Sequence, residues 1–326
     1  MARERLLVMQ MIQVKAWSAG AQALALLSAV HERQWTTYLT EPRSLDELAK
    51  FTLLPTDRLR DVVAALEAIG VVRPTDQGVA LAPEYAALLS DDAPFSLDSL
   101  LDEAQMMSRL VADAVHGVSS GPDSALTVAN AYGLRPSATS RAMFGQLLDA
   151  LPDFRDALVD GRYLDVGCGV GSFVLSTAQT LPGMRAVGIE LVPAVAAEGA
   201  RRAAALGVAD RADIRCMDAR DLEVQDEFDA AFWAQPFFPT DTRPRTLAAI
   251  RRALKPGAKL YMQELERLPE AGVERDAFAL RRLVFTGWGV PFARSAEDLT
   301  AEAEAAGFVL DRVASTPFGR IVVARA

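Results

Sequence analysis

The stretch Tyr163-Leu-Asp-Val-Gly-Cys-Gly-Val-Gly-Ser172 decides how this chain folds. An apolar strand runs into three glycines at alternate positions, and an amphipathic helix is expected directly afterwards, from Phe173 to Gln179. Glycines let the backbone turn sharply and let a ligand approach it closely, beside the free N–H groups of a helix N-terminus. The stretch therefore predicts a ligand-binding loop at the end of a strand.

Two further predicted strands end in an acid. These are Ala186-Val-Gly-Ile-Glu190 and Ile214-Arg-Cys-Met-Asp218. An acid at the tip of the second strand can accept hydrogen bonds from both hydroxyls of a ribose that lies across the strand ends. Asp218, at the third tip, is placed to accept from an adenine amino group, although an Asp after a strand is also an ordinary helix or turn cap. Together they favour a nucleoside-containing ligand.

The glycine pattern leaves two kinds of nucleotide ligand to compare. A dinucleotide fingerprint is G-x-G-x-x-G, or has Ala in the last place, but here Ser172 stands there and the third glycine comes one residue early. A nicotinamide-dependent dehydrogenase is therefore disfavoured. A single G-x-G can also be a plain structural turn, so the loop counts only together with the two strand-end acids.

The chain has two halves with different periodicity. Up to about residue 155 apolar residues recur at helical spacings of three and four, whereas from about residue 160 short strand-like runs alternate with helical segments. That alternation is typical of a parallel sheet covered by helices. The fold class expected is α/β, with a mainly helical part in front of the sheet.

The first half contains a helix, turn, helix, hairpin pattern. Ser44-Leu-Asp-Glu47 is a capping box, a second helix is expected from Thr56 to Ile69, and Val71 to Leu81 reads as two strands around a turn. This order of elements is that of a winged helix, so DNA binding is one hypothesis for this part of the chain. The second helix has a net charge of −1, whereas phosphate contacts require clustered Lys and Arg. We therefore expect a packing or dimerisation module, and the apolar N-terminal segment fits a partner-chain interface equally well.

The amino-acid composition limits the kinds of partner that this protein is expected to bind. The 326 residues carry a net charge of −9 and a pI of about 4.9, so nucleic acid and anionic membrane are unlikely partners. Two cysteines and two histidines offer neither a disulfide framework nor a metal-ligand spacing. The apolar run after Arg5 is interrupted by polar residues, and no stretch is long enough for a membrane span. A cytoplasmic, metal-free protein is expected.

Taken together, the glycine loop, the strand-end acids, a fourth strand Phe228-Asp-Ala-Ala-Phe-Trp233 and Leu254-Lys-Pro-Gly257 resemble class I S-adenosylmethionine-dependent methyltransferases. The winged-helix first half and Gly188-Ile-Glu-Leu-Val-Pro193 narrow the resemblance to the dimeric small-molecule O-methyltransferase family of secondary metabolism. It implies a Rossmann-like methyltransferase sheet after a winged-helix dimerisation domain. The implied divisions are 1–100 for dimerisation, 101–155 for linker helices at the substrate pocket, and 156–326 for the catalytic domain.

The resemblance also implies a cofactor, S-adenosyl-L-methionine, which becomes S-adenosyl-L-homocysteine. The three glycines would cradle its methionine part with Asp165 supporting the loop, Glu190 would bind the ribose, and Asp218 would face the adenine. The expected cofactor-binding residues are Asp165, Gly167, Gly169, Gly171, Glu190, Leu191, Met217, Asp218, Ala219 and Trp233. The implied partners are a second copy of the chain and a small aromatic substrate.

One position departs from the family pattern. After the fourth strand the family normally presents a histidine that deprotonates a phenol, but here the segment reads Phe232-Trp-Ala-Gln-Pro-Phe-Phe-Pro239, and no histidine follows His116. A phenol with a pKa near 10 needs such a base, which typically contributes about 10²–10⁴-fold. An electron-rich carbon or a neutral amine needs only correct positioning. The sequence therefore favours C- or N-methylation of a ring such as an indole.

Aromatic residues suggest where that ring binds. Trp233, Phe237 and Phe238 are expected to form one wall, Phe285, Trp288 and Phe292 to close the other side, and Gln235 to accept a hydrogen bond from a ring N–H. The alternative is that they are core or interface aromatics. The expected substrate residues are Met143, Phe237, Phe238, Phe285 and Trp288, and the expected catalytic residues are His116 and Gln235.

Two alternatives remain open. An O-methyltransferase would need a substitute base, for which His116, Glu103 and Glu264 are candidates by residue type, although a lone histidine at a helix end is more often a cap. A winged-helix regulator that only senses a ligand is the other, and the acidic helix argues against it.

Overall fold

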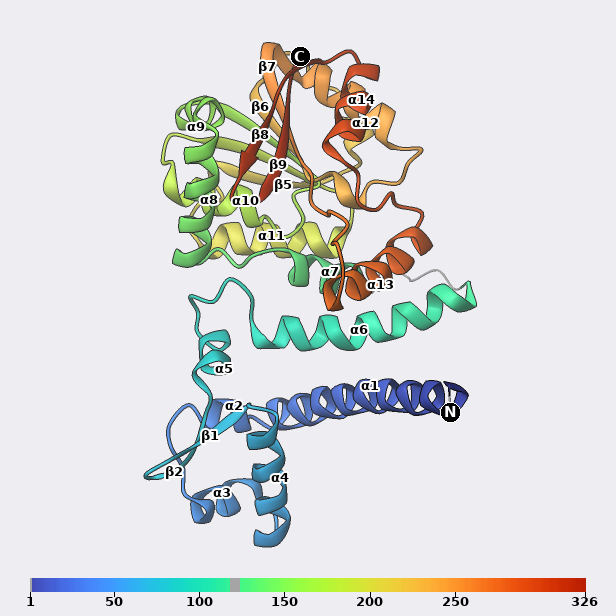
Figure 1. Cartoon of the computed structure of the whole chain (residues 1–326). Helices are drawn as coiled ribbons and strands as arrows, with labels where there is room; N and C mark the ends of the chain where they lie inside the picture. The colour runs from blue at the N-terminus through green and yellow to red at the C-terminus, as the bar shows by residue number, and fades with distance from the viewer. Residues whose placement is uncertain (1, 118–123) are drawn as a thin grey trace. The chain divides into compact units, whose positions relative to one another are not determined.

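The computed structural model describes residues 2–117 and 124–326, with side chains from residue 11 onward. It divides into two compact units, one that ends at Leu101 and one from Asp102 to Ala326 (Figure 1). The boundary lies within helix α6 (Leu97–His116). The helices expected as a separate linker over 101–155 therefore group with the sheet.

The first unit has the element order expected from the sequence. Its elements are α1 (Ala2–Glu32), α2 (Trp35–Tyr38), α3 (Leu45–Thr52), α4 (Thr56–Ala68), the antiparallel pair β1 (Val72–Thr75) and β2 (Gly78–Leu81), and α5 (Pro83–Leu88). The capping box is confirmed, because the Ser44 hydroxyl accepts from the Glu47 N–H and the Glu47 carboxylate from the Ser44 N–H. His31 is buried and hydrogen-bonds Thr36 at 2.7 Å, so this histidine has a structural role.

The second unit alternates strands and helices after four helices. Those four are α6, α7 (Ala125–Tyr132), α8 (Ala138–Ala150) and α9 (Pro152–Val159). The following elements are β3 (Arg162–Val166), α10 (Ser172–Thr180), β4 (Arg185–Glu190), α11 (Pro193–Ala205), β5 (Ala212–Cys216), β6 (Phe228–Trp233), α12 (Arg243–Ala253), β7 (Leu254–Gln263), α13 (Val273–Gly287), α14 (Ala296–Ala305), β8 (Val309–Thr316) and β9 (Gly319–Arg325). Short 3₁₀ turns cover Ala219–Asp221 and Gln235–Phe237.

The strands form one sheet in the order β5-β4-β3-β6-β7-β9-β8. The pairs from β5 to β7 are parallel, and β9 pairs antiparallel with both β7 and β8. The chain moves outward from β3 to β5 and then returns to the other side of β3 as β6. In open α/β sheets, ligands bind at such a switch point, outside the carboxyl ends of the strands. The glycine loop and the segment after β6 therefore leave the sheet side by side.

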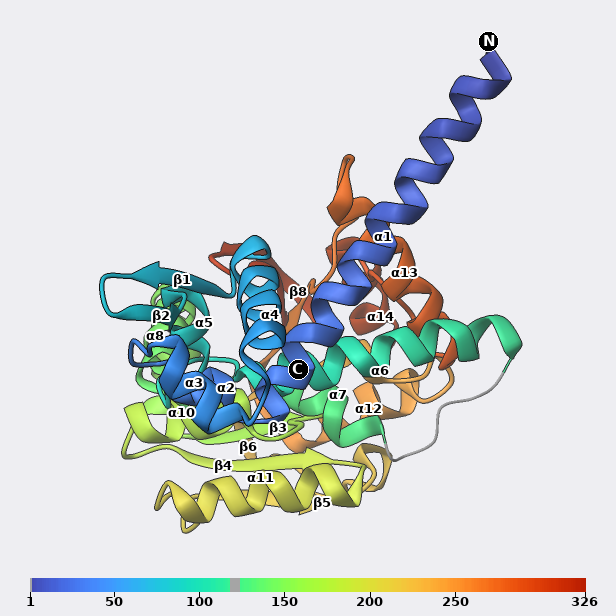
Figure 2. The same cartoon turned by 90° about the horizontal axis from the view of Figure 1, so that it is seen from below.

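The two faces of the sheet are covered by different helices (Figures 1 and 2). Alternate residues of a strand point to opposite faces. Leu164 and Val166 pack with α12 and α14, whereas Tyr163 packs with α8 to α11. Both layers are fully buried, and the α/β fold class is confirmed.

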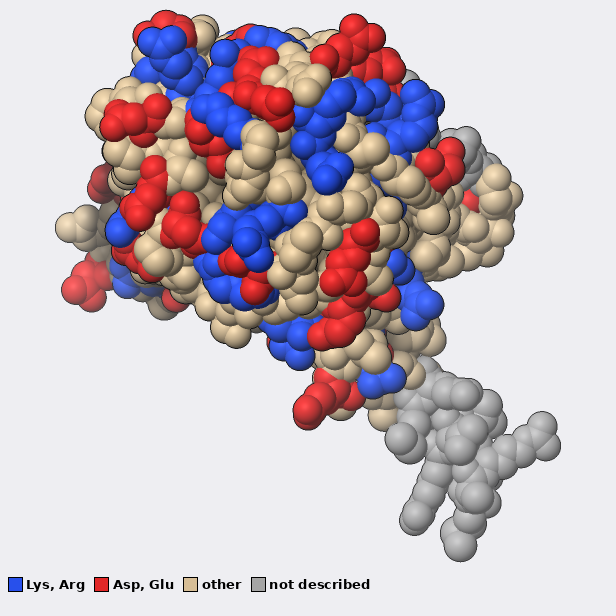
Figure 3. All heavy atoms as spheres, turned by 90° about the horizontal axis from the view of Figure 1, so that it is seen from above, with Lys and Arg blue, Asp and Glu red and all other residues tan. Residues whose placement is uncertain are grey.

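The exterior carries charges of both signs. On the face shown in Figure 3, acidic and basic side chains are interspersed with uncharged ones. Ion pairs of the second unit include Asp153 with Lys259 at 2.8 Å and with Arg312 at 2.5 Å. Within the described ranges, no helix combines the length and apolarity needed to cross a bilayer.

Candidate active site at the switch point

The glycine loop follows β3 and bends back over the sheet. Its turn is fixed by the N–H groups of Gly167 and Cys168, which donate to the carbonyl of Ile189 at 2.8 and 3.0 Å. Gly169 has φ +57°, and a Cβ atom there would meet no heavy atom within 4 Å. A left-handed residue that leaves open space above it is the arrangement expected of a backbone that a ligand approaches closely.

Two acids lie under and beside this loop. Asp165 is only 2% exposed, and burial together with the charge of Glu190 raises its pKa to about 7. The Glu190 carboxylate accepts from the Gly169 N–H at 3.2 Å and from the Val192 N–H at 2.8 Å. Burial raises the pKa of Glu190 as well. An ionised carboxylate has about four acceptor positions, so Glu190 holds the loop and can still accept from ribose hydroxyls.

The residues expected around adenine lie at the ends of β4 and β5. Leu191 is 62% exposed, which leaves an apolar side chain uncovered next to Glu190. Met217 is half-buried and Ala219 is buried. The Asp218 carboxylate is engaged by its neighbour Arg220, whose guanidinium lies at 2.6 Å. An adenine amino group would have to share this carboxylate with Arg220, a contact the sequence did not suggest.

The segment after β6 begins next to the glycine loop. Val166 and Trp233 are register partners at the ends of β3 and β6, and the Ala234 N–H donates to the Val166 carbonyl at 2.9 Å. From there the two phenylalanines diverge. Phe238 lies against the loop, because a Cβ on Gly167 would be 2.7 Å from its ring. Phe237 is 38% exposed and joins a different set of rings.

That set is part of a larger continuous group of rings, five of which are called the aromatic cluster below. Phe237 lies 5.3 Å from Phe285 between ring centroids, and Phe285 lies 5.4 Å from Trp288 and 5.2 Å from Phe292. Tyr132 completes it, edge-on to Phe237 at 5.7 Å and to Phe285 at 6.1 Å. The expected meeting of the two aromatic groups therefore occurs through Phe237. Tyr132 was missed, because nothing in its local sequence distinguishes it.

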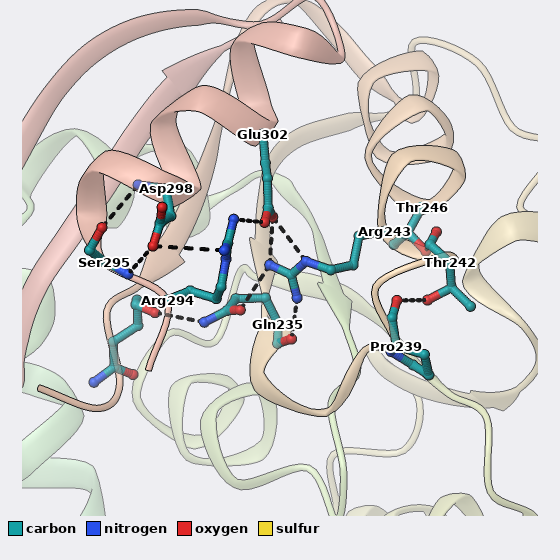
Figure 4. Close-up of polar contacts among 10 residues, drawn as sticks. Gln235, Pro239, Thr242, Arg243, Thr246, Arg294, Ser295, Asp298 and Glu302 are labelled. Carbon is teal, nitrogen blue, oxygen red and sulfur yellow. Dashed lines mark hydrogen bonds and ion pairs between the residues drawn. The ribbon is translucent and has the colours of Figure 1, made fainter. Parts of the chain in front are cut away.

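A buried arginine fixes the start of the segment after β6 (Figure 4). Arg243 donates to the main-chain carbonyl of Gln235 at 2.8 Å, to its side-chain oxygen at 3.0 Å and to the Glu302 carboxylate at 2.6 Å. Arg294 also donates to Glu302, at 2.6 Å. Gln235, Arg243, Arg294 and Glu302 are called the Arg243 cluster below.

Two predictions for this segment need correction. The Gln235 amide is 3% exposed and is held by Arg243 and by the Gln263 carbonyl, so its oxygen does not reach outward to a substrate N–H. Trp233 is fully buried, with the Arg243 guanidinium 4.6 Å from its ring and Phe238 edge-on at 5.4 Å. It is a core residue rather than a wall of the site, because it points to the sheet face covered by α12 and α14.

A hollow opens beside both clusters. It is lined by Gln235, Pro236, Leu265, Glu266, Phe285, Pro291, Phe292, Ala293 and Arg294. Its lining is mostly apolar with a few polar groups, and its volume of about 10 Å³ is enough for roughly one water molecule.

Four polar residues lie within electrostatic range of one another, and one of them, Glu266, lines the hollow. The four are called the Tyr132 cluster below: Glu103, Tyr132, Glu266 and Arg281. Burial, and the charges of Glu103 and Glu266, raise the pKa of Tyr132 to about 12. Burial also raises the pKa of Glu103, and Arg281 opposes that rise. Arg281 itself forms a two-point pair with Glu266 at 3.0 and 3.1 Å.

The remaining candidates are dispersed. His116 is exposed at the end of α6, and Met143 is half-buried on α8. Neither lines the hollow. Glu264 is 4% exposed, but Arg320 binds it at 2.6 and 2.7 Å and lowers its pKa. As a candidate base Glu264 is therefore corrected to a structural ion pair.

One part of the chain matches a known protein family. Residues 164–257, from β3 into β7, match the family model described as "Methyltransferase domain". The chain carries a methyltransferase domain. The expected enzyme class and S-adenosylmethionine as cofactor are confirmed for this domain.

Curated relatives match over part of the chain. A sterol 4-C-methyltransferase of Caenorhabditis elegans is 30% identical over 103 residues, which are 31% of this chain and 30% of the relative. An S-adenosyl-L-methionine-dependent Diels-Alderase of Talaromyces variabilis is 30% identical over 156 residues, 45% of this chain and 53% of the relative. The chain thus spans about a third to a half of these relatives.

Solved structures match over nearly the whole chain. The mitomycin 7-O-methyltransferase MmcR aligns with a TM-score of 0.71 and 23% identity, covering 97% of this chain and 98% of MmcR. Human N-acetylserotonin methyltransferase, solved with S-adenosylmethionine, aligns with a TM-score of 0.73 and 14% identity, covering 97% of both chains. At these identities the likeness shows the shared fold, including a helical part before the sheet.

The site residues fit the cofactor on structural grounds. Gly169 leaves space for a ligand against the backbone, Glu190 keeps free acceptor positions, and Leu191 offers an uncovered apolar side chain. Their individual roles in binding remain predictions.

Proposed function

We propose that this protein is an S-adenosylmethionine-dependent methyltransferase of a small aromatic molecule, and that it methylates carbon or nitrogen of an electron-rich ring such as an indole. One observation carries the proposal. The cofactor loop after β3 and the aromatic segment after β6 start side by side at the switch point, and that segment contains no histidine.

When bound, the cofactor supplies a methyl group on a positively charged sulfur. The residues of this chain supply position and environment. Phe238 lies between the glycine loop and Trp233, and Phe237 presents its ring to Phe285 and Tyr132. Methyl transfer leaves positive charge on a carbon or nitrogen acceptor, and each aromatic face can stabilise a cation by roughly 0.5–2 kcal/mol. Held in line, such an acceptor needs no prior deprotonation.

The decisive experiment uses methyl-labelled S-adenosylmethionine with a mixed panel of indoles, phenols and aryl amines. Mass spectrometry and NMR then locate the label. Label on carbon or nitrogen supports the proposal, whereas label confined to phenol oxygen contradicts it.

Cofactor binding is tested separately by calorimetry with S-adenosylhomocysteine. Gly169→Val fills the open space above the loop, and we expect its binding to weaken at least about tenfold, because a branched side chain is also strained at positive φ. Gly257→Val is the matched control, since Gly257 has φ +79° and equally open space but lies within β7. Equal binding by both variants would argue against the assigned loop.

O-methylation is the second candidate, favoured by one observation. Glu103 is a partly buried carboxylate whose pKa is raised, and it lies in the Tyr132 cluster at the aromatic cluster. MmcR, which shares the fold, is named as an O-methyltransferase. Loss of phenol methylation in Glu103→Gln, with amine and carbon methylation retained, would support this candidate.

We further propose that the protein is a homodimer that works in the cytoplasm, in natural-product biosynthesis. Helix α1 exposes a run of large apolar side chains, namely Met11, Ile12, Val14 and Trp17, of which Trp17 is 64% exposed. Such a run is typical of a helix that packs on a partner. Both cysteines are free, as suits a reducing compartment. Light scattering that gives the mass of one chain, unchanged in Trp17→Asp, would contradict the dimer.

A further inference from the structure

Three helices of the second unit meet beside the aromatic cluster. Met106 and Leu110 of α6 pack with Val128 of α7 and Val284 of α13 in one small buried core. Further along α6, the side chain of Ala114 would lie 3.5 Å from a Cβ on Gly287 of α13. The packed faces of α6 and α13 are therefore defined by these contacts.

Each packed face starts with a charged residue. Glu103 stands three, four and seven positions before Met106, Met107 and Leu110, and residues at these spacings share one side of a helix. On α13, Arg281 has the same spacings to Val284, Phe285 and Trp288. Tyr132 is the last residue of α7 and packs on the same core. The three helices thus bring a carboxylate, a hydroxyl and a guanidinium to the edge of the aromatic cluster.

Two of these polar groups lack partners of their own. Arg281 is paired with Glu266, but across the described residues no hydrogen bond or ion pair holds the Glu103 carboxylate. The Tyr132 hydroxyl is buried and has no hydrogen-bond partner in the part of the chain that the structure describes. Buried polar atoms are nearly always bonded in native proteins, so an orphaned one at a ligand site needs an explanation.

We propose that Glu103 and Tyr132 form the polar edge of the acceptor site, where the Glu103 carboxylate accepts a hydrogen bond from an N–H group of an aromatic acceptor and the Tyr132 hydroxyl provides a second polar contact. The substrate class is thus an aromatic molecule with a hydrogen-bond-donating nitrogen. The inference rests on the proposed function, since it names the acceptor of the same site.

The charges favour a donor over an anion. Glu103, Glu266 and Arg281 give the edge a net charge of −1 when ionised, and the rings of Phe237 and Phe285 present faces that attract cations. An acidic acceptor would meet an unpaired carboxylate. A donor nitrogen would instead satisfy the carboxylate and place its ring against the cluster.

The test compares indole with benzofuran, which has the same shape but carries oxygen in place of the N–H group. Their dissociation constants are measured by NMR titration in the presence of S-adenosylhomocysteine. We expect wild-type protein to bind indole about tenfold more tightly, as a hydrogen bond to a charged group warrants. Glu103→Gln should remove most of this preference, and Tyr132→Phe should weaken indole binding by a smaller factor. Asp102→Asn changes the neighbouring exposed acid of α6 and should leave the preference intact.

An unchanged preference in Glu103→Gln, no preference in the wild type, or binding of neither probe would each overturn the inference. Failure of the proposed function looks different, because label from methyl-labelled S-adenosylmethionine would then be absent or confined to phenol oxygen, whatever the two dissociation constants are. Circular dichroism melting shows that each variant is folded. If Glu103→Gln does not fold, Glu103→Asp shortens the reach of the carboxylate and should reduce the preference in the same direction.

Discussion

The Arg243 guanidinium and the Tyr132 hydroxyl are two polar groups of the same unit that differ in their hydrogen bonding, although the Arg294 Nε of the Arg243 cluster is also buried without a described partner. Every nitrogen of the Arg243 guanidinium is bonded, to Glu302 or to Gln235. In the Tyr132 cluster, by contrast, a hydroxyl is buried without a described partner and a carboxylate is unpaired. Complete bonding holds a backbone segment still, whereas incomplete bonding costs stability and is kept where a ligand completes it. The comparison separates residues that shape the site from residues that bind in it.

The largest change in the free energy of unfolding is expected from removing the fully bonded Arg243 guanidinium. Arg243→Met keeps the packed stem but leaves both oxygens of Gln235 without their donor, and leaves Glu302 paired with Arg294 alone. Loss of one partner of a buried ion pair typically costs about 3–5 kcal/mol in the free energy of unfolding. Urea unfolding measures it. Arg245→Met, an exposed change on the same helix, should stay within about 0.5 kcal/mol. A similarly small effect of Arg243→Met would mean that the cluster contributes little.

Asp165 differs from Arg243 in a way that depends on pH. Both side chains are buried, but no positive charge contributes to the pKa of Asp165. Its folded pKa of about 7 lies above the ordinary value, so between pH 4 and 7 the folded state keeps a proton that the unfolded state releases. Stability therefore falls as pH rises through this window. Three pKa units correspond to at most about 4 kcal/mol.

Asp165→Asn should remove this contribution, so that the variant gains stability relative to the wild type from pH 4 to 7 and stays level above. Unfolding curves at several pH values of the cofactor-free protein measure the difference. Asp210→Asn, at an exposed acid, serves as the control. If the difference in unfolding free energy between variant and wild type stayed constant from pH 4 to 7, the pKa of Asp165 would not be raised.

In the Tyr132 cluster we expect a smaller change in the free energy of unfolding, and one that does not destabilise the protein. Tyr132→Phe removes a hydroxyl whose burial without a partner costs about 1–3 kcal/mol, and keeps the ring contacts to Phe237 and Phe285. The variant should be as stable as the wild type or up to about 1 kcal/mol more stable. A loss above 1 kcal/mol in urea unfolding would show that the hydroxyl is already satisfied.

The smallest effect is expected at His116, which belongs to neither cluster. It is exposed at the end of α6, so His116→Ala should change the unfolding free energy by less than about 0.5 kcal/mol. The kcat/KM for any acceptor found in the labelled panel should stay within about twofold. Complete loss of phenol methylation would instead identify His116 as the missing base.

The sequence predicts most of the cofactor half, because its signals are local. Glycines at alternate positions and an acid at the end of the next strand are read directly from the chain, and β6 has the predicted bounds. The acceptor half could be predicted only in part. The sequence predicts the aromatic groups around Phe237 and Phe285, but it does not predict which rings are buried in the core. The alternation along β6 does not show which face of the sheet is covered by α12 and α14.

Long-range pairs explain the remaining differences. Arg243 binds Glu302, which is 59 positions away in the sequence. Arg243 also binds the side-chain oxygen of Gln235, and the sequence does not reveal this contact. Glu103 was a candidate by residue type alone, and its position beside Tyr132 depends on how α6, α7 and α13 pack. Sequence spacing assigns a residue to one side of its own helix. It does not say which other helix that side meets.

The divergence of Phe237 and Phe238 has an evolutionary consequence. One peptide bond separates a ring that lies on the glycine loop from a ring that lies in the aromatic cluster. Mutation at position 237 can therefore alter the choice of acceptor while the contact of position 238 with the loop is preserved. Two adjacent codons thus serve different parts of the site, so substitution at position 237 offers a route to new acceptors that leaves the contact with the glycine loop in place.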